Sequence, residues 1–389
     1  MILLSVILPA RNEFPNIVHT IYSILHAWEA EGHDPDTLEI IVVDNCSNDD
    51  IHPHRGTAGT TSYLEGRGIY YNARMKILRD PIAGNHSARN KGAKLARGKY
   101  LFFSDAHMAY RPGFFKEMMR TTYESGGLVH GAIAWMGAYP PVVGGVGFSY
   151  TIKLGEEWKG TWAPYYLADD WWYIPSQGHC SVMVDREQFF KFGGYPKVHR
   201  TYGGGEFYID MKWWMMGSTV AVNPKAIGYH LSSGRGYSYN HRDYIENVLG
   251  VTHVLGCDDW RERVYMNALR KTRKEELDEI MARNEVEYKK EKEFVQKNIK
   301  KSFNDLLLER PWDKKNMERH GKANGAMTIF HYTWLDLLAQ SPIALEAYRN
   351  SKYQKGLEEF IENNLSEFIY LGKNFDAERI KKLKEVIWS

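Results

Sequence analysis

An acidic residue and a histidine stand two positions apart at the end of one apolar segment. Residues 98–107, GKYLFFSDAH, begin at a Gly-Lys turn, continue through aromatic and aliphatic residues, and end in Asp105 and His107. The apolar run predicts a buried β-strand, and side chains two apart in an extended segment point to the same side. We therefore expect Asp105 and His107 to face one space, where a carboxylate and an imidazole would supply half of a metal site.

Other carboxylates also stand at the ends of predicted elements. Residues 39–43, EIIVV, predict a second strand, and Asp44 follows it directly. The segment 201–218, TYGGGEFYIDMKWWMMGS, predicts a helix after flexible glycines, and the spacing of Glu206 and Asp210 puts both carboxylates on one helix face near its N-terminus. Two alternatives require no chemistry: Asp44 would cap a turn, and Glu206 would be a carboxylate favoured by the helix dipole.

Strands and helices alternate through the first part of the chain, which predicts an α/β fold built on an open sheet. Ligands of such sheets bind beyond the carboxyl ends of the strands, where Asp44, Asp105 and His107 fall. The predicted strands are residues 3–8, 39–43, 75–78, 98–107, 129–135, 178–185, 220–222 and 227–231. The predicted helices are residues 15–32, 84–96, 111–126, 186–192 and 206–217.

Two stretches lack helical or strand periodicity. Residues 51–68 are rich in Gly, Thr and His and predict an irregular surface loop. Residues 137–175 are dense in Gly, Pro, Trp and Tyr, and such aromatic density argues against disorder. This stretch is interpreted as a lid or an acceptor platform, with core packing as the alternative for Trp158, Trp162, Trp171 and Trp172.

The character of the chain changes after about residue 244. Residues 261–309 are charge-dense with apolar side chains at helical intervals, and residues 355–371 and 377–388 repeat this pattern. We therefore expect two parts, an α/β domain at 1–245 and a mainly helical region at 246–389.

Composition limits the compartment and the partners. The net charge of +2 neither demands nor excludes nucleic acid. Three widely spaced cysteines fit a reducing compartment better than a disulfide framework. Residues 1–9 are apolar but lack a basic start and a cleavage site, and no run reaches the roughly 20 apolar residues that span a bilayer. The expected location is cytoplasmic, without a transmembrane segment.

Several segments together resemble a known enzyme family over about residues 1–235. The segments are PARNE, VVDNCSND, GNHSARNKGAKLARGKYLFFSDAH, GGYP and GGGEFYID. Their order resembles GT-A nucleotide-sugar glycosyltransferases of family 2. The usual Asp-x-Asp is here Asp105-Ala106-His107, and the usual Glu-Asp is Glu206-Phe207. Both departures resemble polypeptide N-acetylgalactosaminyltransferases, and Gly228-Tyr229-His230 matches the later metal histidine of that branch.

The resemblance implies a GT-A fold, a Rossmann-like open and mostly parallel sheet flanked by helices, with a helical C-terminal module. It also implies a divalent cation held by Asp105, His107 and His230. Such a cation stabilises the negative charge that develops on a sugar diphosphate leaving group. Because two imidazoles replace hard carboxylates in this set, we expect Mn²⁺, or another transition ion, in preference to Mg²⁺.

The same resemblance implies a nucleotide-sugar donor, UDP-linked in preference to other carriers. Asp44 would accept a hydrogen bond from the nucleobase. Arg89 would contact the pyrophosphate or seat the donor. Pro9, Arg11 and Glu13 would line the nucleotide pocket, with Glu13 near the ribose or the base.

The expected activity is transfer of a hexosyl or pentosyl group to a hydroxyl acceptor. Glu206 is the first candidate for activating or orienting that hydroxyl, and Asp210 is the second, because general base catalysis needs a carboxylate within hydrogen-bond reach. Typical family 2 members invert the anomeric centre whereas the Asp-x-His branch retains it, so the sequence leaves both outcomes open.

The acceptor is a protein, a glycan or a hydroxylated base in DNA. The DNA alternative draws on basic residues that would hold phosphates around a flipped base, although glutamates are interleaved with them. These residues are Lys271, Arg273, Lys274, Lys289, Lys290, Lys292, Lys297, Lys300 and Lys301. An alternative of another class is a non-catalytic scaffold that binds nucleotide sugars; the presence of Asp105, His107 and Glu206 argues against it.

Overall fold

The computed structural model forms one mixed α/β fold. It describes residues 1–48, 75–136, 143–151, 159–164, 170–231, 240–257, 272–309 and 311–320, with positions 261, 262, 265, 266, 268 and 269. The predicted loop at 51–68, Trp158 and the predicted helices at 355–371 and 377–388 lie outside these residues.

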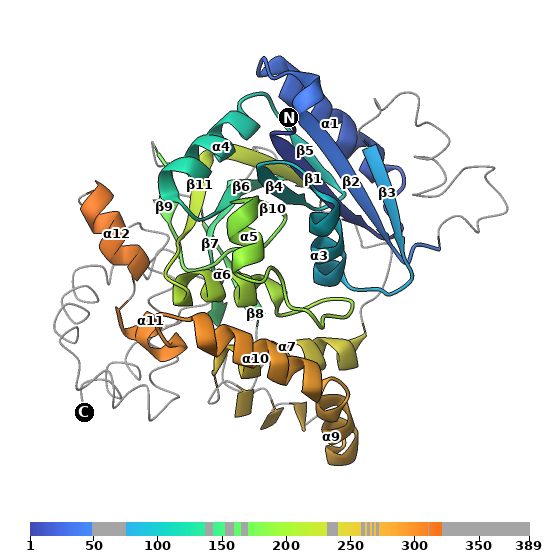
Figure 1. The fold of residues 1–389 in the computed structure, drawn as a ribbon, viewed down its shortest axis with the longest axis vertical. Coiled ribbons are helices and arrows are strands. Elements are labelled where there is room, and N and C mark those ends of the chain that lie inside the picture. Colours follow the sequence, from blue (N-terminus) through green and yellow to red (C-terminus); the bar gives the residue numbers. More distant parts are fainter. Residues whose placement is uncertain are drawn as a thin grey trace.

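The described strands join in a single sheet (Figure 1). They are β1 (Leu4–Ala10), β2 (Leu38–Asn45), β3 (Met75–Asp80), β4 (Tyr100–Ser104), β5 (Met108–Tyr110), β6 (Leu128–Met136), β7 (Val143–Thr151), β8 (Lys159–Pro164), β9 (Trp172–Tyr173), β10 (Ser181–Asp185) and β11 (Val220–Leu231).

The main order of the strands is β3-β2-β1-β4-β10-β6-β11-β5. The first four strands run parallel, and β10 lies antiparallel between β4 and β6. The parallel half places the ends of β1, β2 and β4 at one edge, as the sequence predicts, and Ala10 lies beside Asp44 in the register. The candidate residues that follow these strands therefore gather at this edge.

Helices surround the sheet and extend past it. They are α1 (Asn16–Ala30), η1 (Pro35–Thr37), α3 (Asn85–Leu95), α4 (Phe114–Ser125), α5 (Arg186–Lys191), α6 (Gly205–Met215), α7 (His241–Leu255), α9 (Lys274–Ala282), α10 (Glu285–Asn298), α11 (Phe303–Glu309) and α12 (Pro311–His320).

The sheet divides the core into two layers because successive side chains of a strand point to opposite faces. Val6 and Leu8 of β1 pack with Ile21 of α1 and with residues of α4. Ile7 of the same strand packs in the second layer, which includes Ala88 of α3 and residues of α5 and α6. Strand β1 is thus covered on both faces, which explains its continuous apolar run.

The strands predicted at residues 220–222 and 227–231 are one continuous strand, β11. An irregularity in its register lies between Asn223 and Ile227, where Pro224 lacks a backbone donor. The side-chain amide of Asn223 donates to Glu117 Oε2 at 3.0 Å and to Thr121 Oγ1 at 2.8 Å, both on α4. Because these contacts hold the irregular segment against α4, the strand continues through a proline that interrupts the sequence pattern.

Helices α7, α10, α11 and α12 pack against the layer of the core that contains α6. Val248 of α7, Tyr288 and Val295 of α10 and Trp312 of α12 belong to the same buried cluster as Ile209. Helix α7 itself spans residue 245, where the sequence predicts a domain boundary. The division at 245 stays a prediction.

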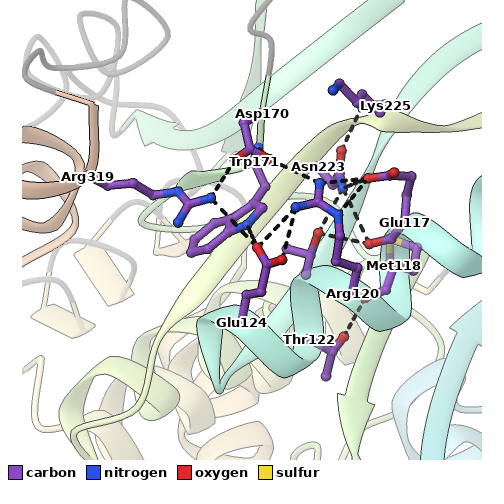
Figure 2. Close-up of polar contacts among 11 residues, drawn as sticks. Glu117, Met118, Arg120, Thr122, Glu124, Asp170, Trp171, Asn223, Lys225 and Arg319 are labelled. Atoms are coloured by element: carbon purple, nitrogen blue, oxygen red, sulfur yellow. Dashed lines mark hydrogen bonds and ion pairs between the residues drawn. The ribbon is translucent and has the colours of Figure 1, made fainter.

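Arg319 of helix α12 lies beside Asp170 and Trp171, which precede β9 (Figure 2). Arg319 contacts Asp170 at 2.5 Å, and its guanidinium lies 3.8 Å from the centre of the Trp171 ring. Asn316, fully buried, exchanges hydrogen bonds with the backbone of Tyr173 at 2.9 and 2.8 Å. Trp171 is 1% exposed, so at this position the core-packing alternative is correct and the acceptor-platform interpretation is wrong.

Charged side chains of helix α4 lie next to Asp170 and Arg319. Arg120 pairs with Glu117, Glu124 and Asp170 at 2.7 to 3.0 Å (Figure 2). These charges are about one-third exposed, so each pair adds little stability by itself.

Among the described residues, no helix is long and apolar enough to cross a membrane.

Candidate active site

Three residues form a candidate metal-binding cluster at the edge of the sheet where β4 ends. Asp105, His107 and His230 each offer one ligand atom, and these atoms lie within 4.8 Å of one another. His230 Nε2 is 3.8 Å from Asp105 Oδ2, and the rings of His107 and His230 meet edge to face at 4.7 Å. The structure thus brings together the three residues that the resemblance implies.

A short antiparallel pairing places His230 beside the other two residues. Asp105 and His107 lie in the turn between β4 and β5, so only Asp105 follows the strand directly. Strand β5 pairs with β11, with His230 opposite Met108, and the Leu231 amide donates to the His107 carbonyl at 3.0 Å. The pairing of two strands that are distant in sequence therefore completes the cluster.

A buried arginine holds the carboxylate of Asp105. Arg89 Nη2 donates to Asp105 Oδ1 at 2.8 Å; the Arg89 side chain is 1% exposed and that of Asp105 24%. Burial tends to raise the pKa of Asp105, but His230, Arg89 and His107 outweigh it and hold the pKa below its usual range. Asp105 is therefore an anion, as a metal ligand requires.

Glu13 contacts the cluster through His107. Its Oε1 lies 3.2 Å from His107 Nδ1, although the resemblance assigns Glu13 to the nucleotide pocket. A carboxylate at one ring nitrogen fixes which nitrogen carries the proton and leaves the other for a metal. Glu13 thus has a structural basis for orienting His107.

The loops after β1 and β2 are tied together next to this cluster. The Asn12 amide donates to Ser47 Oγ at 3.0 Å, and the side chains of Asn12 and Asn48 also bond to each other. Asp44 is 5% exposed, and its Oδ1 accepts from the Ser47 amide at 3.0 Å. Asp44 therefore caps this turn, the alternative recognised in the sequence, and its contact with a nucleobase stays a prediction.

The assignments of Pro9, Arg11 and Arg89 to the donor pocket also stay predictions. Pro9 lies in β1 and Arg11 follows that strand, on the edge that carries Asp105. The structure places Arg89 beneath Asp105, with Nη2 also donating to the His179 carbonyl at 2.8 Å. Arg89 therefore supports the candidate metal ligand from the protein interior.

Glu206 lies in the first turn of α6, as predicted, and is partly buried. Its negative charge acts on Arg89. Burial raises the pKa of the Cys180 thiol, and the charges of Asp105 and Glu206 raise it further. Glu206 and Asp105 therefore act on common neighbours.

The glycines before Glu206 are required by the local backbone. Gly203 and Gly204 have φ values of 112° and 77°, a region that favours glycine. A Cβ atom at Gly205 would lie 2.0 Å from His86. The glycines thus allow α6 to begin against the His86 ring.

Asp210 is fully buried and belongs to a different cluster. Its Oδ1 lies 3.1 Å from both His130 Nε2 and His179 Nε2, and its Oδ2 accepts from Ser176 Oγ at 2.7 Å and from the Gln177 amide at 3.0 Å. With no exposed surface and each oxygen engaged, Asp210 cannot meet an acceptor hydroxyl in this conformation. The structure thus separates Asp210 from the role predicted for it beside Glu206.

Residues 5–135 match the model of "Glycosyl transferase family 2". This region contains β1 to β4, the Asp105-Ala106-His107 turn and Arg89. The matched region, about one-third of the chain, is similar to family 2 glycosyltransferase domains. The resemblance recognised in the sequence is therefore confirmed.

Two curated relatives are similar to a larger part of the chain. "Probable N-acetylgalactosaminyltransferase 9" of Caenorhabditis elegans is 22% identical over 236 residues, 56% of this chain and 40% of that protein. "Polypeptide N-acetylgalactosaminyltransferase 3" of Drosophila melanogaster is 24% identical over 291 residues, 66% of this chain and 39% of that protein. The chain thus spans about two-fifths of these relatives' length.

A solved structure of GalNAc-T7 with UDP, GalNAc and Mn²⁺ shares the fold of this glycosyltransferase domain. It aligns with a TM-score of 0.57 and 19% identity, and the match covers 82% of this chain and 58% of that one. This similarity confirms the GT-A fold that the sequence predicts.

Sequence reasoning missed the residues that support the cluster from below. His179, His130 and Tyr195 are buried, and His179 contacts both Asp210 and the Tyr195 hydroxyl. A histidine in the apolar segment 178–185 was the available signal. Its partners on other elements carry no local pattern.

Proposed function

We propose that this glycosyltransferase domain is an active, metal-dependent enzyme that moves a sugar from a UDP-linked donor to a hydroxyl acceptor. The observation that carries the proposal is the convergence of Asp105, His107 and His230 at the edge where β4 ends. Glu206 lies near enough for its charge to act on Arg89, which holds Asp105.

The residues of this cluster fit a divalent transition ion. They supply one carboxylate and two imidazoles, a donor set that suits Mn²⁺ and related ions better than Mg²⁺. Arg89 occupies one oxygen of Asp105, and the other lies on the His230 side. When bound, the ion would neutralise charge on the diphosphate leaving group.

The chain's own residues would orient the reactants. Arg89 holds Asp105 and Glu13 holds His107, so both side chains are oriented before the donor arrives. The linked loops that contain Asn12 and Asn48 would line the nucleotide site, together with Arg11 and Asp44 beside them. Glu206 would accept a hydrogen bond from the acceptor hydroxyl, or its proton.

Support for a UDP donor and a protein acceptor comes from the relatives. The GalNAc-T7 structure contains UDP, and the Drosophila relative is named as a polypeptide transferase. Several lysines invoked for DNA pair with acids instead: Lys274 contacts Asp278 at 2.6 Å and Lys290 contacts Glu287 at 2.8 Å. We therefore propose a side-chain hydroxyl of a protein as the acceptor.

A donor-turnover assay tests the proposal. We expect the purified protein to hydrolyse or transfer sugar from at least one of a panel of UDP-sugars with Mn²⁺, and EDTA to abolish this activity. Asp105→Ala should lower turnover by about 10²-fold or more, because one ligand and its charge are lost. Retention of a UDP-sugar without any turnover would support the scaffold alternative, and turnover unaffected by EDTA and by Asp105→Ala would refute the metal site.

A further inference from the structure

A buried polar cluster lies beneath the candidate metal site. It consists of Asp210 of α6, His130 of β6, and His179 and Tyr195 from the segments that flank β10 and α5. These four side chains are at most 1% exposed. No group of this cluster reaches solvent, so its role must be exerted through the residues it contacts.

Asp210 binds one short segment of the chain, residues 176–179. Three of its four hydrogen bonds go to residues 176–179: the Ser176 hydroxyl, the Gln177 amide and the His179 ring. This segment precedes β10, which begins at Ser181, so the pairing of the strands does not hold it. The hydrogen bonds to Asp210 hold this segment in place of the backbone hydrogen bonds between paired strands.

The end of this segment holds the candidate metal ligand. The His179 carbonyl accepts from Arg89 Nη2 at 2.8 Å, and the same Nη2 donates to Asp105 Oδ1 at 2.8 Å. The Cys180 carbonyl accepts from the Asp105 backbone amide at 3.1 Å. Both the side chain and the backbone of Asp105 therefore depend on the position of residues 179 and 180.

The ring of His179 is fixed at both nitrogens. Nε2 contacts Asp210, and Nδ1 contacts the Tyr195 hydroxyl at 2.8 Å. Burial lowers the pKa of His179 to about 4, so the ring is neutral, with one nitrogen donating and the other accepting. A neutral ring held in this way cannot rotate without breaking a buried hydrogen bond.

We propose that Asp210 is a positioning residue that fixes the geometry of the metal site through His179, Arg89 and Asp105. Asp210 lies one helical turn after Glu206 on α6. It therefore ties the helix that presents the acceptor-side carboxylate to the segment that presents the metal ligand. This inference rests on the proposed function.

His130, His179 and Asp210 also have the composition of a metal site. The hydrogen bonds favour the positioning role: each oxygen of Asp210 already has two partners, and Tyr195 completes His179. A buried carboxylate with this many donors is stable as an anion. The positioning role therefore requires no ion at this cluster.

Asp210→Asn tests the proposal. An amide has one acceptor oxygen and one donor nitrogen, so one pair of donors, either the two rings or Ser176 and Gln177, would face an N–H group. Loss of such support to a metal site typically weakens metal binding about 10–100-fold. We expect the Mn²⁺ dissociation constant, measured by electron paramagnetic resonance of free Mn²⁺, to rise at least about tenfold, and excess Mn²⁺ to restore part of kcat.

Tyr195→Phe is a milder second variant, because it removes only the hydroxyl that contacts His179. It should shift the Mn²⁺ dissociation constant in the same direction by a smaller factor. Glu291→Gln is the matched control: Glu291 is a 6% exposed carboxylate that accepts from Tyr208 Oη at 2.6 Å and from the Lys197 amide at 3.0 Å. It should lower the melting temperature and leave Mn²⁺ binding unchanged.

The outcomes separate this inference from the proposed function. If the unmutated protein neither binds Mn²⁺ nor turns over a UDP-sugar, both are wrong. If the unmutated protein does both and a folded Asp210→Asn variant matches its Mn²⁺ affinity and kcat, only the positioning role is wrong. A second equivalent of metal in the unmutated protein, lost in Asp210→Asn, would show that the cluster binds an ion and would also overturn the positioning role.

Discussion

At the scale of single residues, Glu13 is the side chain whose expected role the structure changes most. It contacts His107 Nδ1 at 3.2 Å, and both side chains are mostly buried. Glu13→Gln removes the charge that favours a proton on Nδ1, so His107 should become a poorer ligand. We expect the Mn²⁺ dissociation constant to rise about tenfold, measured by the same titration of free Mn²⁺.

Glu29→Gln is the control for this substitution. Glu29 is an exposed carboxylate on α1, so the same loss of charge occurs away from His107. Its Mn²⁺ affinity should equal that of the unmutated protein. If Glu13→Gln binds Mn²⁺ as tightly as Glu29→Gln, Glu13 does not orient the ligand and its assignment to the nucleotide pocket regains support.

At the scale of elements, the N-terminus of helix α4 is capped by a carboxylate at the end of α1. Glu31, the C-cap residue of α1, accepts from the backbone amides of Gly113, Phe115 and Lys116 at 2.9, 3.0 and 2.7 Å. These amides stand at the N-terminus of α4, where intrahelical partners are absent and negative charge is favoured. Since α4 supports the irregular part of β11, this cap also helps to place the strand that carries His230.

Glu31→Ala should therefore destabilise the protein. Loss of a helix cap costs about 0.5–2 kcal/mol, and the three amides place this one at the upper end of that range. Urea denaturation should show the loss, and amide hydrogen exchange should increase first in the initial turn of α4. Glu29→Ala, at an exposed position on α1, should change the free energy of unfolding by much less. Equal effects of Glu31→Ala and Glu29→Ala would contradict the cap.

At the scale of the whole molecule, buried neutral histidines couple stability to pH. Burial lowers the pKa of both His179 and His199 to about 4, whereas an unfolded histidine titrates near pH 6.5. The groups around these two rings are Arg89, His86, His130, Tyr195 and Asp210.

Between pH 6.5 and about 4 the unfolded chain binds more protons at these two sites than the folded chain. The free energy of unfolding should therefore fall as the pH falls, by up to about 2.7 kcal/mol per pH unit for two sites. Urea denaturation between pH 7 and 5 measures this slope, and His199→Gln should reduce it by up to about 1.4 kcal/mol per pH unit, the contribution of one site. A free energy that stays constant from pH 6.5 to 5 would show that folding does not lower the pKa of these histidines.

The sequence predicted the strands of the parallel half and helices α1, α3, α4 and α6 to within a few residues. The strands β1, β2 and β4 can be recognised in the sequence because the sheet buries both of their faces, so burial leaves a continuous apolar run. Strand β11 was divided in two because Pro224 interrupts its pattern, and contacts with α4 that compensate for this proline are invisible in sequence.

The candidate site divides in the same way. By itself the sequence placed Asp105 and His107 at the end of β4 and Glu206 at the start of α6, because strand ends and helix starts leave local patterns. The family resemblance added His230. Only the tertiary structure decided that Glu13 contacts His107, that Arg89 lies beneath Asp105, and that Asp210 is buried with two histidines. These contacts join elements distant in the chain, and such partners are determined by the packing of the sheet and helices, not by the spacing of residues.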